Sequence, residues 1–144
     1  MSYIAPNGPV SKRLQIAEIT LSGSPSVNGY FTFSTLVDHT FDSAPTGLTT
    51  ETLSLPAGSY MFRACLDVTR SNSSQNYQFQ FEADSNLIGR VGQTGLYTNK
   101  RADVCEAVFR SSNTIALKLE ATAIETSAPT LTTGSKLFIW RVDN

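Results

Sequence analysis

The segment from Leu53 to Arg70 constrains the fold of this chain more than any other stretch. It reads as a short strand, a Pro-Ala-Gly turn and a long strand of strict alternation. Pro56 cannot donate a hydrogen bond to a ladder, and Gly58 tolerates turn conformations that other residues avoid, so the break has a backbone cause. Because strand side chains alternate with a period of two, one face of the long strand is predicted to be a core face. Its residues are Tyr60, Phe62, Ala64, Leu66 and Val68.

Further strands are predicted along the chain, and no window shows the periodicity and capping signals of a helix. They are Leu14–Ser22, Tyr30–Val37, Glu51–Leu55, Tyr77–Glu82, Ala102–Arg110, Asn113–Ile124 and Lys136–Val142. The apolar face of the first strand switches near Glu18, which indicates a bulge or burial on both sides. The pattern predicts an all-β domain, an antiparallel jelly-roll sandwich of about eight or nine strands.

The chain divides into two parts, an N-terminal arm over residues 1–13 and a jelly-roll domain over residues 14–144. Pro6, Gly8 and Pro9 forbid a regular helix in the arm and disfavour a central strand. The apolar residues Tyr3, Ile4 and Val10 are too few to fold alone. The arm is therefore expected either to fray or to dock on a neighbour.

Composition excludes several classes of function. Charged residues make up 16% of the 144 residues, the net charge is −1, and the 11 Lys and Arg are scattered, so no basic groove for nucleic acid is expected. No apolar run approaches the roughly 20 residues of a membrane span, and no signal-peptide pattern precedes the domain. Cys65 and Cys105 are predicted to be free thiols, because they fall on different faces and lack metal or redox spacing.

Catalytic chemistry finds little support in the residues. The one histidine, His39, follows Asp38, and the two side chains would point to opposite faces of a strand, so a strand-end histidine is expected rather than a triad. The carboxylates Glu82, Asp84, Asp103 and Glu106 are read as ordinary solvated groups. We expect no enzyme activity, no catalytic residue, no metal and no cofactor.

The last strand is apolar on both faces, in contrast to Tyr77–Glu82, which is apolar on one face only. It contains Leu137, Phe138, Ile139 and Trp140 in succession, and part of Val104–Phe109 behaves in the same way. Strands buried on both faces of a sandwich need a cover beyond the opposite sheet. A second copy of the chain supplies that cover most simply, so we predict a homo-oligomer.

Several motifs resemble those of the tumour-necrosis-factor-like jelly-roll family, which includes complement-type globular heads and bacteriophage virion proteins. They are the strand entry Leu55-Pro56-Ala57-Gly58-Ser59-Tyr60, the Tyr77 to Gly89 hairpin and the closing strand Gly134-Ser135-Lys136-Leu137-Phe138-Ile139. The resemblance covers about Thr40 to Val142. It implies a homotrimer in which the first, the organising, the Ala102 and the terminal strands form the sheet that faces a threefold axis, although twofold symmetry stays open.

Within this family, a short Ser/Thr-rich chain without a stalk or a signal resembles a phage capsid decoration, or cement, protein. The resemblance implies a virion location on the outer capsid after synthesis in the host cytoplasm, with the major capsid protein and the chain itself as partners. Cys105, Phe109, Phe138 and Trp140 would then form the trimer interface, and Tyr3, Ile4 and Val10 would grip the shell. The alternative is a receptor- or glycan-binding tail-tip module that uses loop residues Asn72, Asn76 and Tyr97.

Overall fold

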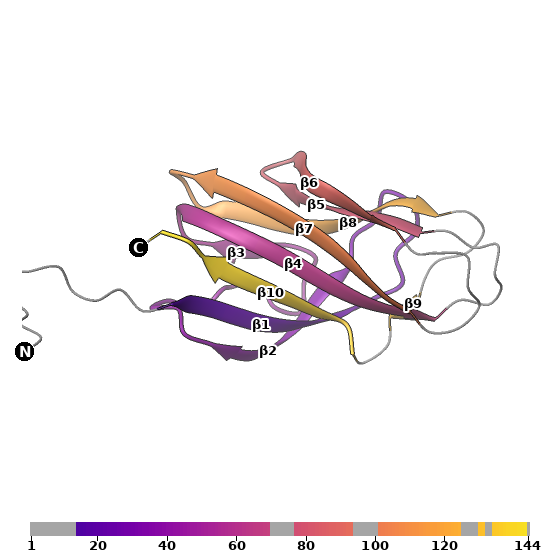
Figure 1. Ribbon diagram of the computed structural model, residues 1–144, viewed down its shortest axis with the longest axis horizontal. Coiled ribbons are helices and arrows are strands. Elements are labelled where there is room, and N and C mark those ends of the chain that lie inside the picture. Colours follow the sequence, from indigo (N-terminus) through magenta and orange to yellow (C-terminus); the bar gives the residue numbers. More distant parts are fainter. Residues whose placement is uncertain (1–13, 70–76, 94–100, 125–129, 132–133, 144) are drawn as a thin grey trace, which may run out of the picture.

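Strands alone build the computed structural model, which describes residues 14–69, 77–93, 101–124, 130–131 and 134–143 (Figure 1). They are β1 (Gln15–Ser22), β2 (Thr32–His39), β3 (Leu53–Leu55), β4 (Gly58–Thr69), β5 (Tyr77–Ala83), β6 (Asn86–Gln93), β7 (Arg101–Ser111), β8 (Ile115–Ile124), β9 (Thr130–Leu131) and β10 (Lys136–Arg141). No helix among the described residues is long and apolar enough to cross a membrane. The predicted all-β class is confirmed.

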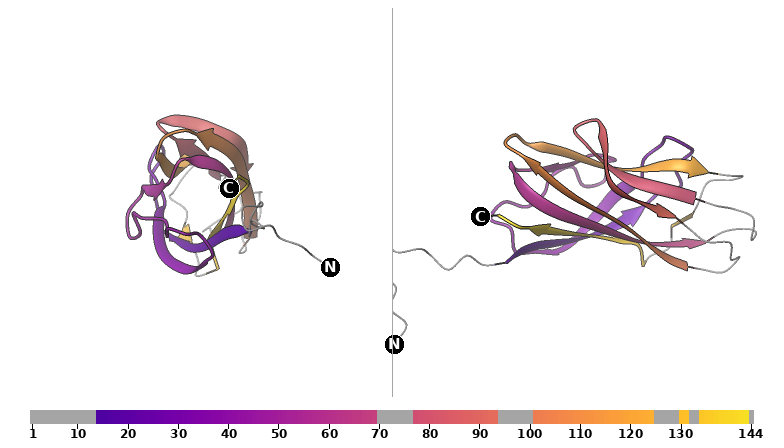
Figure 2. Two further views of the ribbon diagram at one scale, coloured as in Figure 1. Left: turned by 90° about the vertical axis from the view of Figure 1, so that its left-hand side faces the viewer. Right: turned by 45° about the horizontal axis from the view of Figure 1, so that its top comes forward.

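The strands form two packed layers that enclose one interior (Figure 2). We call β2-β1-β10-β4-β7 the front sheet, because it faces the viewer in Figure 1, and β5-β8-β3 the back sheet. All pairings are antiparallel, and β6 joins the layers by pairing with β5 and, at Arg90, with β7. The short β9 pairs with the end of β4. The predicted antiparallel sandwich is therefore confirmed, with ten strands in the described residues instead of eight or nine.

The predicted core face of β4 lies at the centre of the interior. Tyr60, Phe62, Ala64 and Leu66 have no exposed surface, while the side chain of Val68 lies outside the described part. The Phe62 ring packs 5.6 Å from that of Phe81 on β5, centroid to centroid. Each such ring stabilises the fold by roughly 1.5–3 kcal/mol through burial. The alternation that predicted this core was therefore correct.

Only the start of β6 was predicted, as the second arm of the Tyr77 to Gly89 hairpin, because three glycines suggested an irregular connection from Gly89 onward. Gly89 has a φ of 72°, and a Cβ there would lie 2.4 Å from the Cβ of Ala107. A Cβ at Gly92 would lie 2.3 Å from the Phe79 ring. The glycines thus allow β6 to pass close to its neighbours, a packing reason that periodicity cannot show.

The second strand begins later and ends later than predicted. The residues before it bond to the back sheet, since Phe31 N–H donates to Leu119 O at 3.0 Å and Ala121 N–H donates to Gly29 O at 2.9 Å. The chain then crosses and pairs with β1 as β2. The β1–β2 ladder shifts register twice between Glu18 and Leu21, and the extra residues lie on β2. The predicted switch of the buried face within β1 is not found, because Ala17, Ile19 and Leu21 are all buried in regular alternation.

Candidate self-association face

The outward side of the front sheet is arranged in rows, because residues directly opposite one another in an antiparallel ladder point to the same side. The apolar row contains Ile16, Trp140, Met61 and Val108. The charged row beside it contains Asp38, Glu18, Phe138, Arg63, Glu106 and Arg90. A third row contains Thr20, Lys136, Cys65 and Val104. Five adjacent strands, and β6 beyond them, therefore present one patterned surface.

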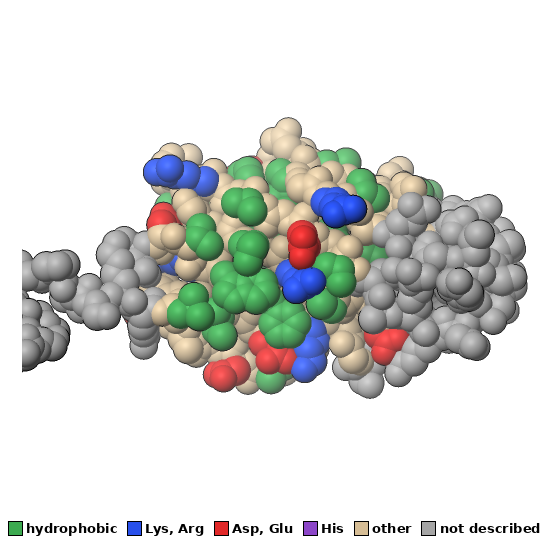
Figure 3. All heavy atoms as spheres, in the orientation of Figure 1, with side chains coloured by type: hydrophobic (Ala, Val, Ile, Leu, Met, Phe, Trp, Pro, Cys, Tyr) green, Lys and Arg blue, Asp and Glu red, His purple; other side chains and the backbone are tan. Residues whose placement is uncertain are grey.

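The apolar row is exposed in the single chain. Val108 is 68% exposed, Met61 39% and Ile16 38%. Trp140 is half-buried, and its ring stacks on that of Phe138 with the centroids 6.0 Å apart. Figure 3 shows hydrophobic side chains gathered over these strands with few charges between them. A contiguous apolar surface of this kind marks an interaction site more often than a solvent-facing sheet.

Two ion pairs neutralise the middle of the face. The Lys136 ammonium lies 2.5 Å from a Glu18 carboxylate oxygen, and the Arg63 Nε atom lies 3.2 Å from a Glu106 carboxylate oxygen. These four charges therefore leave the centre of the surface nearly neutral, which lowers the cost of covering it.

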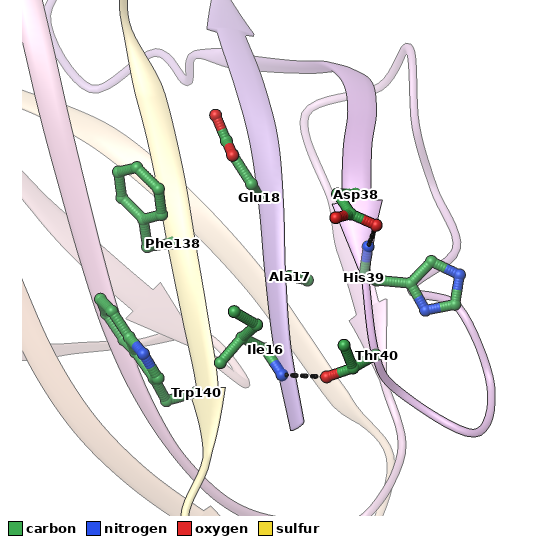
Figure 4. Close-up of a pocket in the computed structure, with 8 residues that line it drawn as sticks. All are labelled: Ile16, Ala17, Glu18, Asp38, His39, Thr40, Phe138 and Trp140. Atoms are coloured by element: carbon green, nitrogen blue, oxygen red, sulfur yellow. Dashed lines mark hydrogen bonds between the residues drawn. The ribbon is translucent and has the colours of Figure 1, made fainter. Parts of the chain in front are cut away.

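A small hollow of about 90 Å³ opens between β1, β2 and β10. The stacked rings of Phe138 and Trp140 lie on one side, and the carboxylates of Glu18 and Asp38 lie on β1 and β2 (Figure 4). The Thr40 hydroxyl accepts a hydrogen bond from Ile16 N–H at 2.9 Å and donates one to Leu14 O at 2.8 Å. The chain that follows β2 is thereby held against the start of β1, where it borders the hollow.

The structure contradicts the assignment of Cys105 to an interface between copies. Cys105 has no exposed surface in the single chain, and its thiol donates to Arg90 O at 3.2 Å. Burial raises the pKa of this thiol to about 11. Phe109, on the same side of β7, is partly buried against the domain core. Both residues belong to the inward side of β7, whose outward positions include Val104, Glu106 and Val108.

The structure places the other predicted site residues in two groups. Phe138 and Trp140 do lie on the outward face, so their role between copies stays a prediction that this geometry permits. The predicted shell-binding and loop residues lie outside the described residues; they are Tyr3, Ile4, Val10, Asn72, Asn76 and Tyr97. Ile16 and Met61 were not among the predicted interface residues, although a large apolar residue between two core positions of a strand is a signal that could have found them.

Cys65 and Cys105 are free thiols, as predicted. His39 is the last residue of β2, and its ring points away from Asp38, whose carboxylate accepts the His39 backbone N–H (Figure 4). Glu82 lies on the back sheet and Glu106 on the front sheet, so these two carboxylates do not converge. No group of three potential metal ligands occurs in the described segments.

Comparisons with known proteins bear on the fold. No family model and no curated protein matches the sequence. The globular domain of zebrafish complement 1qA protein matches 92% of this chain and 98% of its own, with a TM-score of 0.64 and 10% identity. Eiger TNF from S. frugiperda has a TM-score of 0.65 and 10% identity, and the match covers 92% of this chain and 95% of that one. Murine APRIL has a TM-score of 0.65 and 7% identity, and the match covers 90% of this chain and 100% of that one. The chain therefore has the tumour-necrosis-factor-like jelly-roll fold.

Proposed function

We propose that this chain is a structural virion protein, a capsid decoration or cement protein that binds an assembled phage shell as a homotrimer. The observation that carries the self-association is the apolar row of Ile16, Trp140, Met61 and Val108, which a single domain leaves uncovered. Burying large apolar side chains stabilises an interface by roughly 1.5–3 kcal/mol each. Four such side chains in one row, with Phe138 beside them, are typical of the interface of a permanent assembly.

The topology supports the front sheet as the shared surface. The four strands that the family resemblance assigns to a threefold axis are β1, β10, β4 and β7, and they are neighbours in the front sheet in that order. The outward side of the back sheet instead presents polar residues such as Gln78, Gln80 and Glu82. We therefore infer that the front sheet faces the other copies and that the back sheet faces solvent.

The mechanism of a cement protein is binding without catalysis. A ligand that binds the assembled shell and not its separated subunits stabilises assembly by mass action. In this proposal the trimer sits on the outer capsid, its partner is the major capsid protein, and the arm formed by residues 1–13 holds the shell. The start of β1, to which the arm is joined, lies beside the end of β10 and next to the apolar row.

Three measurements test this proposal. Sedimentation of the purified chain should give a trimer, and a monomer at high concentration would contradict it. Quantitative mass spectrometry of purified particles should then give about as many copies as of the most abundant shell protein. A few copies per particle would favour the second candidate below, and absence from all particles would refute both. A chain without residues 1–10 should remain trimeric but lose shell binding.

The second candidate is a receptor- or glycan-binding tip, and the positions of the strand ends favour it. The ends of five strands come together at the end of the sandwich opposite the start of β1, because Val68 pairs with Arg101, Gln78 with Gln93 and Tyr77 with Ile124. Three connections therefore leave from one end of a rigid scaffold, where recognition often resides. A glycan array with the purified chain separates the candidates, since a cement protein should show no saccharide preference.

A further inference from the structure

The charged row carries opposite charges at its two ends. Glu18 is paired with Lys136, and Arg63 is paired with Glu106, so the charges inside the row are already compensated. The two residues at its ends, Asp38 on β2 and Arg90 on β6, make no ion pair within the described part of the chain, and both are exposed. The row is therefore negative at one end and positive at the other.

The negative end is suited to a guanidinium group. Asp38 and Glu18 provide carboxylates beside the hollow that Phe138 and Trp140 line with stacked rings. An Arg side chain pairs with carboxylates and stacks on aromatic faces, and it gives up hydration more readily than Lys does. At the positive end, Arg90 borders an open depression shared with Arg63, Val91, Val104 and Glu106. This arginine and the hollow lie in one row on opposite flanks of the face.

The register of the row restricts the symmetry of an assembly. Asp38 and Arg90 lie at the same height along the strands, because each is linked to the next residue of the row by direct pairing. Rotation about an axis parallel to the strands keeps that height and turns the Arg90 end of one copy toward the Asp38 end of the next. A twofold axis along the row would place like charges together, which is costly at an interface.

We propose that copies of this chain associate around an axis parallel to the front-sheet strands, with Arg90 of each copy entering the Asp38 hollow of the next. The inference rests on the proposed self-association through the front sheet and adds the pairing that sets its register. The partner is a second copy of this chain, and the contact joins a guanidinium to a carboxylate and two aromatic rings. In a ring of three, the contact recurs three times and closes the assembly.

Charge reversal in the full chain tests the pairing. Arg90→Glu and Asp38→Lys should each raise the apparent dissociation constant of the assembly at least about tenfold, because each places like charges together. The double variant Arg90→Glu/Asp38→Lys restores opposite charges and should return to within about threefold of the unmodified chain. Sedimentation velocity over a concentration series gives the constants, and circular dichroism confirms that each variant is folded.

Two matched controls reverse charges outside the row. Lys118→Glu changes a lysine on the outward side of β8 in the back sheet, and Glu51→Lys changes an exposed acid before β3, near Tyr30 on the back sheet. Both should assemble like the unmodified chain. Equal losses in the controls and in the row variants would overturn the pairing, and so would a double variant that is no better than the single variants.

A mixture of the two single variants tests ring closure. In an even-numbered ring the variants can alternate, so every contact joins opposite charges. In a ring of three, one contact must join two copies of the same variant and stays repulsive. The equimolar mixture should therefore assemble more weakly than the double variant, and full recovery in the mixture would overturn threefold closure.

The failure of this inference is distinguishable from that of the proposed function. An unmodified chain that stays monomeric refutes self-association itself. A trimer whose assembly is unchanged by Arg90→Glu and by Asp38→Lys refutes only the pairing along the charged row.

Discussion

The two outward faces of this sandwich cover the same core but differ in chemistry. On β5 and β8 the outward residues include Gln78, Gln80, Glu82 and Lys118, as a sheet in contact with water requires. On the front sheet the equivalent positions hold Ile16, Met61 and Val108 beside two stacked rings. A domain needs only one apolar side per sheet to fold, so the second apolar side reflects a requirement beyond folding.

The largest predicted difference between the faces comes from placing a Lys at matched central positions. Met61→Lys on β4 should abolish assembly, because an unpaired charge buried between copies costs about 3–5 kcal/mol. Gln80→Lys on β5 should leave assembly unchanged, since that position faces solvent. Sedimentation equilibrium measures both variants. Equal behaviour of the two would remove the functional distinction between the faces.

The junction between the two layers should be the next most sensitive region. Gly89→Ala introduces a Cβ within 2.4 Å of Ala107 at a φ of 72°. Steric overlap and backbone strain together should lower the free energy of unfolding by about 2–4 kcal/mol. Gly134→Ala, where the nearest atom to a new Cβ is 3.2 Å away on Asp67, serves as the milder control. Urea denaturation at one protein concentration gives both values, and equal losses would contradict the close approach of β6.

A smaller effect is expected on the polar face of the back sheet. Partial burial and the nearby Glu82 carboxylate raise the pKa of Glu120. A raised pKa in the folded state means that folding favours the protonated carboxyl. The contribution of Glu120 to the free energy of unfolding is therefore complete below the pKa of this group in the unfolded chain. It is lost as the pH rises through the pKa of the same group in the folded chain.

Glu120→Gln removes the repulsion that remains above the folded pKa. It should raise stability by about 0.2–0.5 kcal/mol near neutral pH, because solvent screens this mostly exposed pair. The gain should shrink in acid, and denaturation at two pH values measures it. A variant that is less stable at neutral pH would show that the charged form is the favoured one. Gln80→Glu, which adds a charge directly opposite Glu120, should have the reverse effect.

The smallest expected effect is a difference in reactivity between the two thiols of the unmodified chain. Cys65 lies in the third row of the front sheet and is partly exposed, whereas Cys105 is buried with a pKa of about 11. Near pH 8 only about one Cys105 thiol in a thousand is ionised, so it should resist alkylation. Cys65 should react in dissociated chains and be protected in the assembly. Mass spectrometry of alkylated peptides reads both sites, and an equally reactive Cys65 in the assembly would place it outside the interface.

Local pattern was enough to locate most of the strands and the core. Alternation over residues 60–66 identified four side chains that are fully buried, and the doubly apolar run at 137–140 identified a strand with two half-buried aromatic rings on its outward side. Pattern failed at β6, where the glycines serve packing against Ala107 and Phe79. It also failed at Cys105, because a single strand shows two faces without showing which one points inward.

The sequence by itself determined the all-β class, the organising strand and the presence of more apolar surface than one core needs. Period-two alternation is local, so it can be read without knowing which strands are neighbours. Only the tertiary structure decided which apolar positions share a face. Ile16, Met61, Val108 and Trp140 come from four separate segments, and the pairing register aligns them in one row. The same register places Asp38 and Arg90 at opposite ends of another row, because strand order and register arise from long-range pairing that no local window contains.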